Sequence, residues 1–212
     1  MENTTRRKVL GLLGLAGIAP IAGRLLTTSA AAAEVGLSAP RDKIRRRYFP
    51  NVSLQTQDGK QVRFYDDLIK DKIVTINFFY AKCDGICPTV TANLAQVQRI
   101  LGPRVGRDIF MYSISLKPEQ DTPAALKEYA EMFQAKPGWT FLTGKPGDIE
   151  LLRRSLGFTN LDPKLDQDKS QHIGNVRYGN EPLMLWAACP GMASPEFIAK
   201  TISWMIRPEA AS

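Results

Sequence analysis

The chain has 212 residues, of which 44% are hydrophobic and 23% charged, with a formal net charge of +7. These globular values exclude whole-chain disorder and collagen-like structure, and three cysteines are too few for a disulfide-built mini-protein. The single histidine excludes sites that need several imidazoles, such as a His-rich zinc enzyme, and the absence of an uncharged apolar run of about 18 residues argues against a stable transmembrane span.

The N-terminal segment has the order basic, apolar, small that is typical of a secretory signal peptide. Arg6 and Arg7 precede an apolar stretch over residues 9–22, and four alanines end at Ala33. The paired arginines favour the twin-arginine export route over the general one. We therefore expect residues 1–33 to be a cleaved twin-arginine signal peptide and the mature protein to be periplasmic or otherwise exported. An uncleaved N-terminal anchor is the alternative.

A basic cluster follows the signal, and we predict that residues 34–49 form a linker before a folded domain at residues 50–208. A basic cluster can bind nucleic acid. Behind an export signal, however, a solvated linker or one that lies on anionic lipid is the better interpretation, so no nucleic-acid partner is expected. The cluster consists of Arg41, Lys43, Arg45, Arg46 and Arg47.

Strands and helices alternate through the predicted domain. Residues 73–80 are β-branched and aromatic nearly throughout, as in a strand buried on both faces. Apolar residues at helical spacing then run to a stop at Gly102 and Pro103. In chain order the pattern predicts a hairpin at 52–56 and 62–64, a strand at 73–80, a helix at 90–101, a strand at 109–115, a helix from 122, a strand at 139–142, a helix at 148–156, a hairpin at 175–178 and 183–186, and a helix at 195–205.

This order predicts the α/β fold class. Alternating strands and helices imply a sheet with helices on both faces, and a final antiparallel hairpin after a βαβ unit is the layout of a thioredoxin-like domain. We therefore expect a thioredoxin-like fold with a central mixed sheet, helices on both faces and an added N-terminal β-hairpin. A fold alone assigns no function.

Cys83 and Cys87 lie in the turn between the buried strand and the next helix, with Pro88 directly after them. Proline suits the first helical position, so Cys87 is expected at or beside the N-cap, where the helix dipole favours a thiolate. Gly85 lets the loop fold tightly enough for the two sulfurs to converge. A purely stabilising disulfide is disfavoured because so small a loop removes little chain entropy, and a closed zinc site would lack its fourth ligand.

His172 lies just before the second predicted hairpin. A lone histidine is more often a surface or hydrogen-bonded residue than a metal ligand. The hairpin is expected beside the strand that carries the cysteines, however, and this favours a role for His172 with them. Two thiolates and one imidazole form a soft three-coordinate set that suits Cu(I) and can also hold Cu(II).

With these motifs in place, the sequence resembles the Sco/SenC family of thioredoxin-like copper-binding proteins of the periplasm and the mitochondrial intermembrane space. The likeness runs from about Pro50 to Trp204. Its matching pieces are the strand at 75–80, the C-x3-C-P motif, residues 113–123 with their Pro-x-x-Asp-Thr-Pro segment, the helix at 126–130, residues 138–144, and His172 ahead of a hairpin.

The resemblance implies delivery of copper, or reduction of cysteines, at the dinuclear copper site of a respiratory oxidase. Cys83, Cys87 and His172 would be the copper ligands, and the two cysteines would also be the redox pair. The expected partners are the copper-site subunit of a respiratory oxidase or reductase and a thioredoxin-like reductant. A metallochaperone is favoured over an enzyme.

Two positions depart from or extend the family pattern. Lys117 stands where the family commonly has an aspartate, which would alter partner recognition or reduction potential. Cys189 follows the last hairpin and is interpreted as a buried small hydrophobe; a resolving thiol or an extra ligand is the alternative. The acid-rich stretch at 162–168 is interpreted as a solvated loop.

Three other functions stay open. A thiol–disulfide oxidoreductase would use the same two cysteines, and its activity would survive His172→Ala. A copper-dependent redox sensor would keep the metal without delivering it. A peroxiredoxin-like peroxidase is disfavoured because no threonine lies three residues before Cys83 or Cys87.

Overall fold

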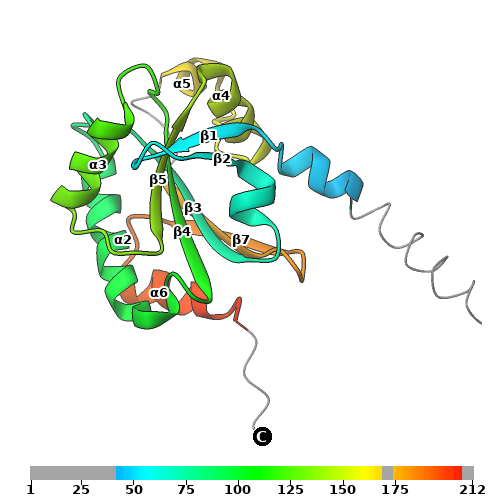
Figure 1. Cartoon of the computed structure of the whole chain (residues 1–212), viewed down its shortest axis with the longest axis vertical. Coiled ribbons are helices and arrows are strands. Elements are labelled where there is room, and N and C mark those ends of the chain that lie inside the picture. Colours follow the sequence, from blue (N-terminus) through cyan, green and yellow to red (C-terminus); the bar gives the residue numbers. More distant parts are fainter. Residues whose placement is uncertain (1–41, 169–173, 207–212) are drawn as a thin grey trace, which may run out of the picture. The chain divides into compact units, whose positions relative to one another are not determined.

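A mixed seven-stranded sheet forms the centre of the computed structural model, which describes residues 42–168 and 174–206 (Figure 1). The chain divides into two compact units, Met1–Asp42 and Lys43–Ser212. The described residues other than Asp42 belong to the second unit, whereas the predicted signal peptide at 1–33 lies outside them. Within the described ranges, no helix has both the length and the apolar character needed to cross a membrane.

The strands follow the order β2-β1-β5-β4-β3-β6-β7. β3, β4 and β5 are parallel, and the strands on either side pair antiparallel. The predicted central mixed sheet with an added N-terminal hairpin is therefore confirmed. The strands are β1 (Ser53–Thr56), β2 (Gln61–Arg63), β3 (Ile73–Phe79), β4 (Ile109–Ser115), β5 (Trp139–Gly144), β6 (Asn175–Asn180) and β7 (Leu185–Pro190).

Three of the helices begin at a proline that follows a short polar residue, which is Thr122, Asp162 or Ser194. The side chains of Thr122 and Ser194 accept the backbone N–H groups of Ala125 and Phe197, which caps two of the helices. The helical elements are η1 (Phe64–Ile69), α2 (Cys87–Leu101), η2 (Gly102–Arg104), α3 (Pro123–Met132), α4 (Pro146–Ser155), α5 (Pro163–Gln167) and α6 (Pro195–Ser203). Residues 42–48 are also helical, inside the segment predicted as a linker.

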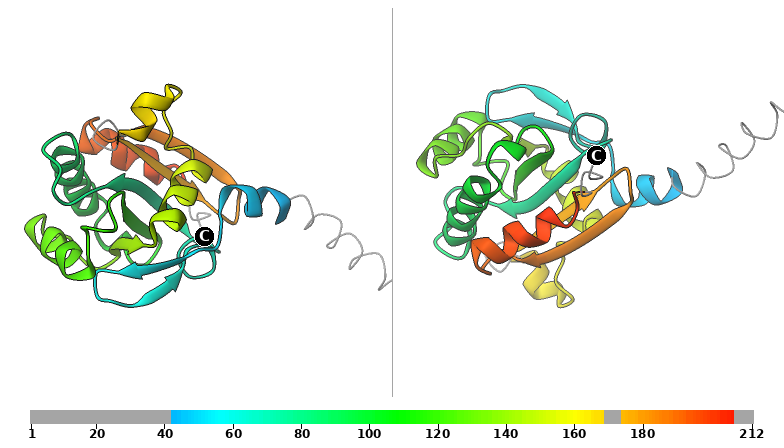
Figure 2. Two further views of the ribbon diagram at one scale, coloured as in Figure 1. Left: turned by 90° about the horizontal axis from the view of Figure 1, so that it is seen from above. Right: turned by 90° about the horizontal axis from the view of Figure 1, so that it is seen from below.

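Helices cover both faces of the sheet, as predicted (Figure 2). On one face Tyr129 of α3 packs on Phe79 of β3 with ring centroids 5.0 Å apart, and its hydroxyl lies 3.0 Å from that of Thr91 in α2. On the other face Phe78 meets Phe158, which follows α4, at 4.8 Å. Successive residues of β3 thus bury against different helices, which is why five of its seven residues are apolar.

The second hairpin turns later than predicted. The sequence suggested a turn at Gly179 and Asn180, but β6 continues through both, and the turn occupies residues 181–184. Glu181 fixes this position, because its backbone N–H bonds to the Lys72 carbonyl at 3.0 Å and its carboxylate accepts the backbone N–H of Asp71 at 3.0 Å.

The interpretation of residues 162–168 as a solvated loop is wrong for its central part. These residues include α5, and Asp166 accepts two hydrogen bonds, at 2.6 and 2.7 Å, from the buried guanidinium of Arg153. Arg153 also bonds to Glu150 and to the carbonyl of Phe158. The acidic stretch is therefore tied to α4 by a partly buried ion-pair network.

Candidate functional site

The cysteine loop, residues 81–86, connects the end of β3 to the start of α2. It lies at the carboxyl ends of the parallel strands, because the backbone N–H of Leu116, just after β4, bonds to the carbonyl of Phe79 at 2.7 Å. This edge is where open α/β sheets place their sites. Polar or reactive side chains from the loop, from α2 and from the segment after β4 therefore gather at one end of the sheet.

The structure brings Cys83 and Cys87 together. Both are buried, with exposed fractions of 6% and 1%, and their side chains are hydrogen-bonded to each other. Cys87 is the first residue of α2, after Ile86 at the N-cap. The backbone N–H of Gly85 points back to the Cys83 sulfur at 3.4 Å. All three cysteines of the chain lie in the described part, where none is disulfide-bonded.

The two thiols differ in acidity, in the opposite sense to the sequence-based prediction. Burial alone would raise the pKa of Cys83, but hydrogen bonds from Tyr80 and Cys87 outweigh it, so the Cys83 pKa is lowered. Burial raises the pKa of Cys87 to about 12, and the hydrogen bond with Cys83 adds to this rise. The expectation of a Cys87 thiolate at the helix N-terminus is therefore wrong: the deeper burial of Cys87 outweighs the dipole, and Cys83 is the more acidic thiol.

Tyr80 connects the thiols to Lys117. The Tyr80 hydroxyl bonds to the Cys83 sulfur, and this bond is the main reason that the Tyr80 pKa is raised. The ammonium of Lys117 lies 4.0 Å from the centroid of the Tyr80 ring, on the carboxyl side of β4. A cation over the face of an aromatic ring is stabilised by a cation–π interaction. Lys117 thus packs on the tyrosine that bonds to Cys83, and neither Tyr80 nor this contact was found from the sequence.

A buried carboxylate holds the start of the cysteine loop. Asp121 is 2% exposed and accepts the backbone N–H of Ala81 at 3.2 and 3.3 Å and the hydroxyl of Ser115 at 2.5 Å. Ser115 in turn accepts the backbone N–H of Lys117 at 3.0 Å. Burial raises the pKa of Asp121. Asp121 belongs to the Pro-x-x-Asp-Thr-Pro segment, which the sequence marked as a motif without giving the residue a role.

The start of β6 packs against the beginning of α2. A Cβ on Gly174 would lie 2.3 Å from Cδ1 of Ile86, and one on Gly191 would lie 2.8 Å from Cγ1 of Val90. The backbone N–H of Gly191 bonds to the carbonyl of Gly174 at 2.8 Å, and the Asn93 amide donates to the carbonyl of Gly191 at 2.9 Å. Glycines at both positions therefore let the second hairpin approach the cysteine loop closely.

His172, the third predicted ligand, lies outside the described residues. Among the residues that are described, no three His, Cys, Asp or Glu side chains are grouped as a metal site would require. The described part of the site thus supplies two sulfur donors. Thiolates are the soft ligands that copper(I) favours, so the donor chemistry of the pair fits copper.

Cys189 lies on another strand than the cysteine loop and has different neighbours from Cys83 and Cys87. It is 5% exposed on β7, and the hydroxyl of Thr201 in α6 lies 4.0 Å from its sulfur. Burial raises the pKa of the Cys189 thiol. These features agree with the interpretation of Cys189 as a small buried core residue.

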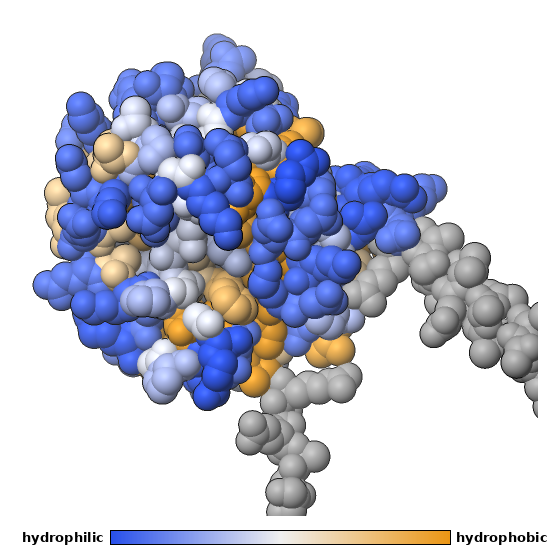
Figure 3. Space-filling view, in the orientation of Figure 1, coloured by the Kyte–Doolittle hydropathy of each residue, from blue (hydrophilic) through white to orange (hydrophobic). Residues whose placement is uncertain are grey.

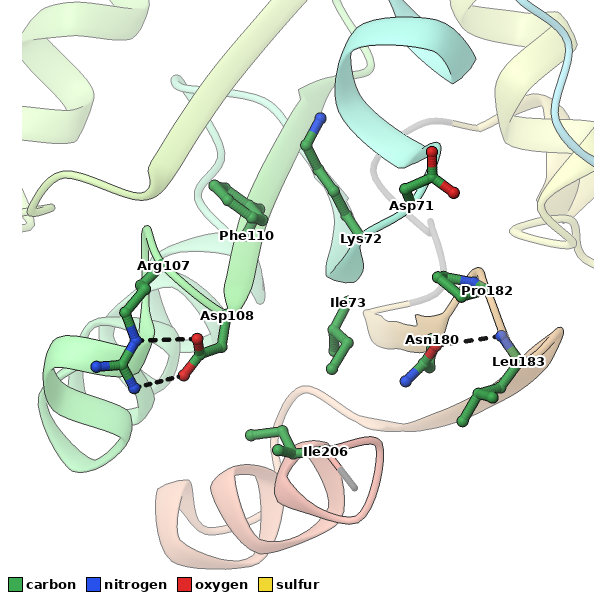
Figure 4. A pocket seen from close by; sticks show the side chains of 10 residues that line it. All are labelled: Asp71, Lys72, Ile73, Arg107, Asp108, Phe110, Asn180, Pro182, Leu183 and Ile206. Carbon is green, nitrogen blue, oxygen red and sulfur yellow. Dashed lines mark hydrogen bonds and ion pairs between the residues drawn. The ribbon is translucent and has the colours of Figure 1, made fainter. Parts of the chain in front are cut away.

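A cavity of about 610 Å³ opens at the opposite end of the sheet, where β3 and β4 begin (Figure 4). Three of its four charged side chains are already engaged: Arg107 pairs with Asp108 at 2.7 Å, and Lys72 bonds to the carbonyl of Asp67. The face of the molecule seen in Figure 3 is largely hydrophilic, and a band of hydrophobic side chains crosses it. This cavity holds no cysteine, so the candidate site remains the cysteine loop.

The chain is similar to known proteins over most of the described domain. A family model described as SCO1/SenC matches residues 43–207. The SCO1 protein homolog of Bacillus subtilis is 33% identical over 93 residues, which are 43% of this chain and 47% of that protein. A SCO2-like protein of Rickettsia conorii is 34% identical over 87 residues, 41% of each chain. The matched segments thus span less than half the length of these curated relatives.

The solved structures are matched over a larger share of their own length than the curated relatives are. The copper-bound structure of ScoI from Bradyrhizobium japonicum is 26% identical, with a TM-score of 0.60, over 74% of this chain and 99% of that one. BsSco, a member of the Sco family of cytochrome c oxidase assembly proteins in which a disulfide switch was identified, is 25% identical, with a TM-score of 0.59, over 75% and 94% of the two chains.

Proposed function

The chain belongs to the SCO1/SenC family, and from this we propose that it is an exported copper chaperone that binds one copper ion and delivers it to the copper site of a respiratory oxidase or reductase. The observation that carries the proposal is the pair of adjacent, buried thiols of Cys83 and Cys87 at the carboxyl ends of the parallel strands of the sheet. Copper is the cargo in this proposal, and the exported location rests on the N-terminal signal pattern.

The relatives support the choice of metal and of client. ScoI of Bradyrhizobium japonicum has been solved with copper bound, and BsSco belongs to a family of cytochrome c oxidase assembly proteins. For this chain we infer the same cargo and a copper-site subunit as the client.

We propose Cys83, Cys87 and His172 as the ligands. The lowered pKa of Cys83 favours the thiolate form of this ligand, and copper would displace the proton of Cys87, as metals do from coordinating thiols. His172 lies two positions before Gly174, and two positions along the chain span at most about 7 Å. Because Gly174 packs on Ile86 beside the cysteines, an imidazole from position 172 is a suitable third donor.

The surrounding residues would hold and protect the thiols. Tyr80 donates a hydrogen bond to Cys83, which would orient this sulfur, and Asp121 fixes the backbone at Ala81. The burial of both sulfurs limits access of water and oxidants. Bound copper would supply a soft cation that a client's own thiolates can take over by ligand exchange.

Reduction of a client's cysteines is the second candidate function, favoured by the difference in pKa between the two thiols. The Cys83 thiolate would attack a client disulfide and release one client thiolate. Cys87, after losing its proton, would attack Cys83 of the mixed disulfide and release the second client thiolate. The chain would be left with a Cys83–Cys87 disulfide, having given two electrons to the client, and a thioredoxin-like reductant would restore it.

Copper titration of the reduced chain tests the primary proposal. We expect one copper per chain by elemental analysis, loss of binding in Cys83→Ser and Cys87→Ser, and weaker binding in His172→Ala. Cys189→Ser is the matched control and should bind as the wild type does. No stoichiometric copper in a wild-type chain whose thiols still react would contradict the chaperone, and turnover of a client-peptide disulfide by that chain would favour the reductase.

A further inference from the structure

A second cavity, here called the hairpin cavity, lies away from the cysteine loop and plays no part in the proposed function. It has a volume of about 330 Å³. Residues 44–49, the end of α4 and the β6–β7 hairpin surround it. Its lining residues are Ile44, Tyr48, Phe49, Ser155, Leu156, Arg177, Met184 and Trp186.

Trp186 forms an aromatic wall of the hairpin cavity because Gly179 leaves room for its ring. A Cβ on Gly179 would lie 2.3 Å from Cε3 of Trp186, so the indole lies directly over the β6 backbone. The ring of Phe49 packs on the indole with centroids 4.6 Å apart. Ile44 and Tyr48, which are 47% and 44% exposed, add apolar surface near solvent.

Two buried nitrogen donors in this lining lack acceptors. Nε of Arg177 and Nε1 of Trp186 are both buried and have no hydrogen-bond partner within the described structure. Burying an N–H without an acceptor is unfavourable, so such groups call for an explanation. Gly179 pairs with Trp186, and Arg177 lies two residues before Gly179 on the same face of β6. The two donors therefore belong to one face of the hairpin.

The positive charge of Arg177 also has no ion-pair partner among the described residues. Its guanidinium lies 6.0 Å from the centroid of the Phe158 ring, and Nη2 would be 3.0 Å from a Cβ on Gly157. Nothing in the described ranges forms an ion pair with Arg177, whereas the nearby Asp166 and Glu150 are paired with Arg153. Burial lowers the pKa of Arg177, but a guanidinium keeps its proton.

A cation and a neutral N–H donor in an apolar cavity fit a ligand with one anionic head and an apolar body. The planar guanidinium matches a carboxylate in particular, since the two can form paired hydrogen bonds. At about 30 Å³ for each water-sized group, 330 Å³ holds roughly eleven non-hydrogen atoms. This is the size of a medium-chain fatty acid.

We propose that the hairpin cavity binds a medium-chain monocarboxylate, with the carboxylate on Arg177 and the Trp186 indole N–H and the apolar tail against Phe49, Leu156 and Met184. The ligand would satisfy both buried donors and cover the apolar wall. This inference does not depend on copper, because neither the cavity nor its donors include a residue of the cysteine loop.

Titration of the full chain with decanoate tests the proposal, with decanol as the uncharged counterpart. Heats of binding give the affinity, and the ¹⁵N–¹H signal of the Trp186 indole, assigned from Trp186→Phe, reports the site. We expect one decanoate per chain, a shifted Trp186 signal, and binding of decanol weaker by roughly tenfold or more, the usual effect of a charge-assisted hydrogen bond. Arg177→Leu should lower the decanoate affinity by a similar factor.

Arg99→Leu is the matched control, because it removes the same charge from an exposed position on α2 and should leave binding unchanged. If Arg177→Leu does not fold, Trp186→Phe keeps an aromatic ring, removes the N–H, and should still weaken decanoate binding. Absence of saturable binding below the micelle concentration overturns the proposal. Equal affinity for decanoate and decanol, or equal effects of the two arginine substitutions, overturns it as well.

Discussion

The carboxylate of Asp121 accepts the backbone N–H of Ala81, although the two residues are 40 positions apart in the sequence. Through this contact the segment that leads into α3 holds the chain two residues before Cys83. The Ser115 hydroxyl, at the end of β4, bonds to the same carboxylate. One buried side chain thus joins two parallel strand ends to the cysteine loop.

Asp121→Ala should destabilise the fold and loosen the site. It leaves a buried N–H and a hydroxyl without their acceptor, an effect of about 2–3 kcal/mol. We expect a lower midpoint in urea and weaker copper binding, whereas Asp121→Asn, which keeps one oxygen, should have a smaller effect. Glu119→Ala removes an exposed acid from the same segment and should change the unfolding free energy by less than about 0.5 kcal/mol.

Tyr80→Phe should raise the pKa of Cys83. The hydroxyl stabilises the thiolate by a hydrogen bond, and losing a bond to a charged group corresponds to about one to two pKa units. Alkylation of Cys83 by iodoacetamide, followed by mass spectrometry across pH, should therefore shift to higher pH. Tyr112→Phe removes the hydroxyl of a buried tyrosine on β4 and should leave the pH profile of Cys83 alkylation unchanged. An unshifted profile in Tyr80→Phe would show that the bond does not set the Cys83 pKa.

Gly174→Ala should disturb the cysteine loop through Ile86. The new Cβ would meet Cδ1 of Ile86 at 2.3 Å, and overpacking of this kind costs about 1–2 kcal/mol. Ile86→Val deletes the clashing atom, so the double variant should recover most of the lost stability and copper affinity. Gly147→Ala, where a Cβ would meet nothing within 4 Å, is the control. If the losses of stability in the two single variants simply add up in the double variant, the contact between Gly174 and Ile86 is not the cause.

The Arg153–Asp166 pair should make stability sensitive to acid. Hydrogen bonds from Arg153 hold the pKa of the Asp166 carboxyl well below its usual range. Because the folded-state pKa lies below the unfolded one, the stabilisation is complete above about pH 4 and is lost as pH falls through the folded-state value. Asp166→Asn should therefore lower the unfolding free energy by about 2 kcal/mol at pH 7, and less near pH 3.

Asp58→Asn provides the comparison for this pH effect. Asp58 pairs with Lys127 at 3.5 Å, but its side chain is 64% exposed, and exposed pairs contribute little. Its substitution should leave the pH dependence of unfolding unchanged. If Asp166→Asn and the wild type lose stability in parallel between pH 7 and pH 3, the pair does not contribute as described.

Strands and helices with a long, uniform pattern could be predicted from the sequence. β3 and β4 are buried on both faces, so most of their residues are β-branched, aromatic or otherwise apolar. The turn of the second hairpin was predicted too early because Gly179 and Asn180 are typical turn residues. In the structure Gly179 lies within β6, where its missing side chain leaves room for the ring of Trp186. α5 has five residues and no buried side chain, so it has no hydrophobic period to detect.

The candidate site was predictable only in its reactive residues. Cys83 and Cys87 are recognisable from their spacing and the following proline. Tyr80 and Asp121 act through contacts that depend on the tertiary fold, and no local pattern separates them from core residues. The relative acidity of the two thiols also depends on burial and hydrogen bonds, which a helix-dipole argument from sequence omits.

The pairing of β6 with β3 also has a consequence for synthesis of the chain. Ile73 pairs with Asn180, so the neighbour of the cysteine-bearing strand is made more than a hundred residues after that strand begins. Pairings this distant form late and slowly. Until β6 is made, a growing chain has nothing to close that side of the sheet, and its thiols stay open to oxidation. Such a chain depends on reductants in its surroundings until its last third has been synthesised.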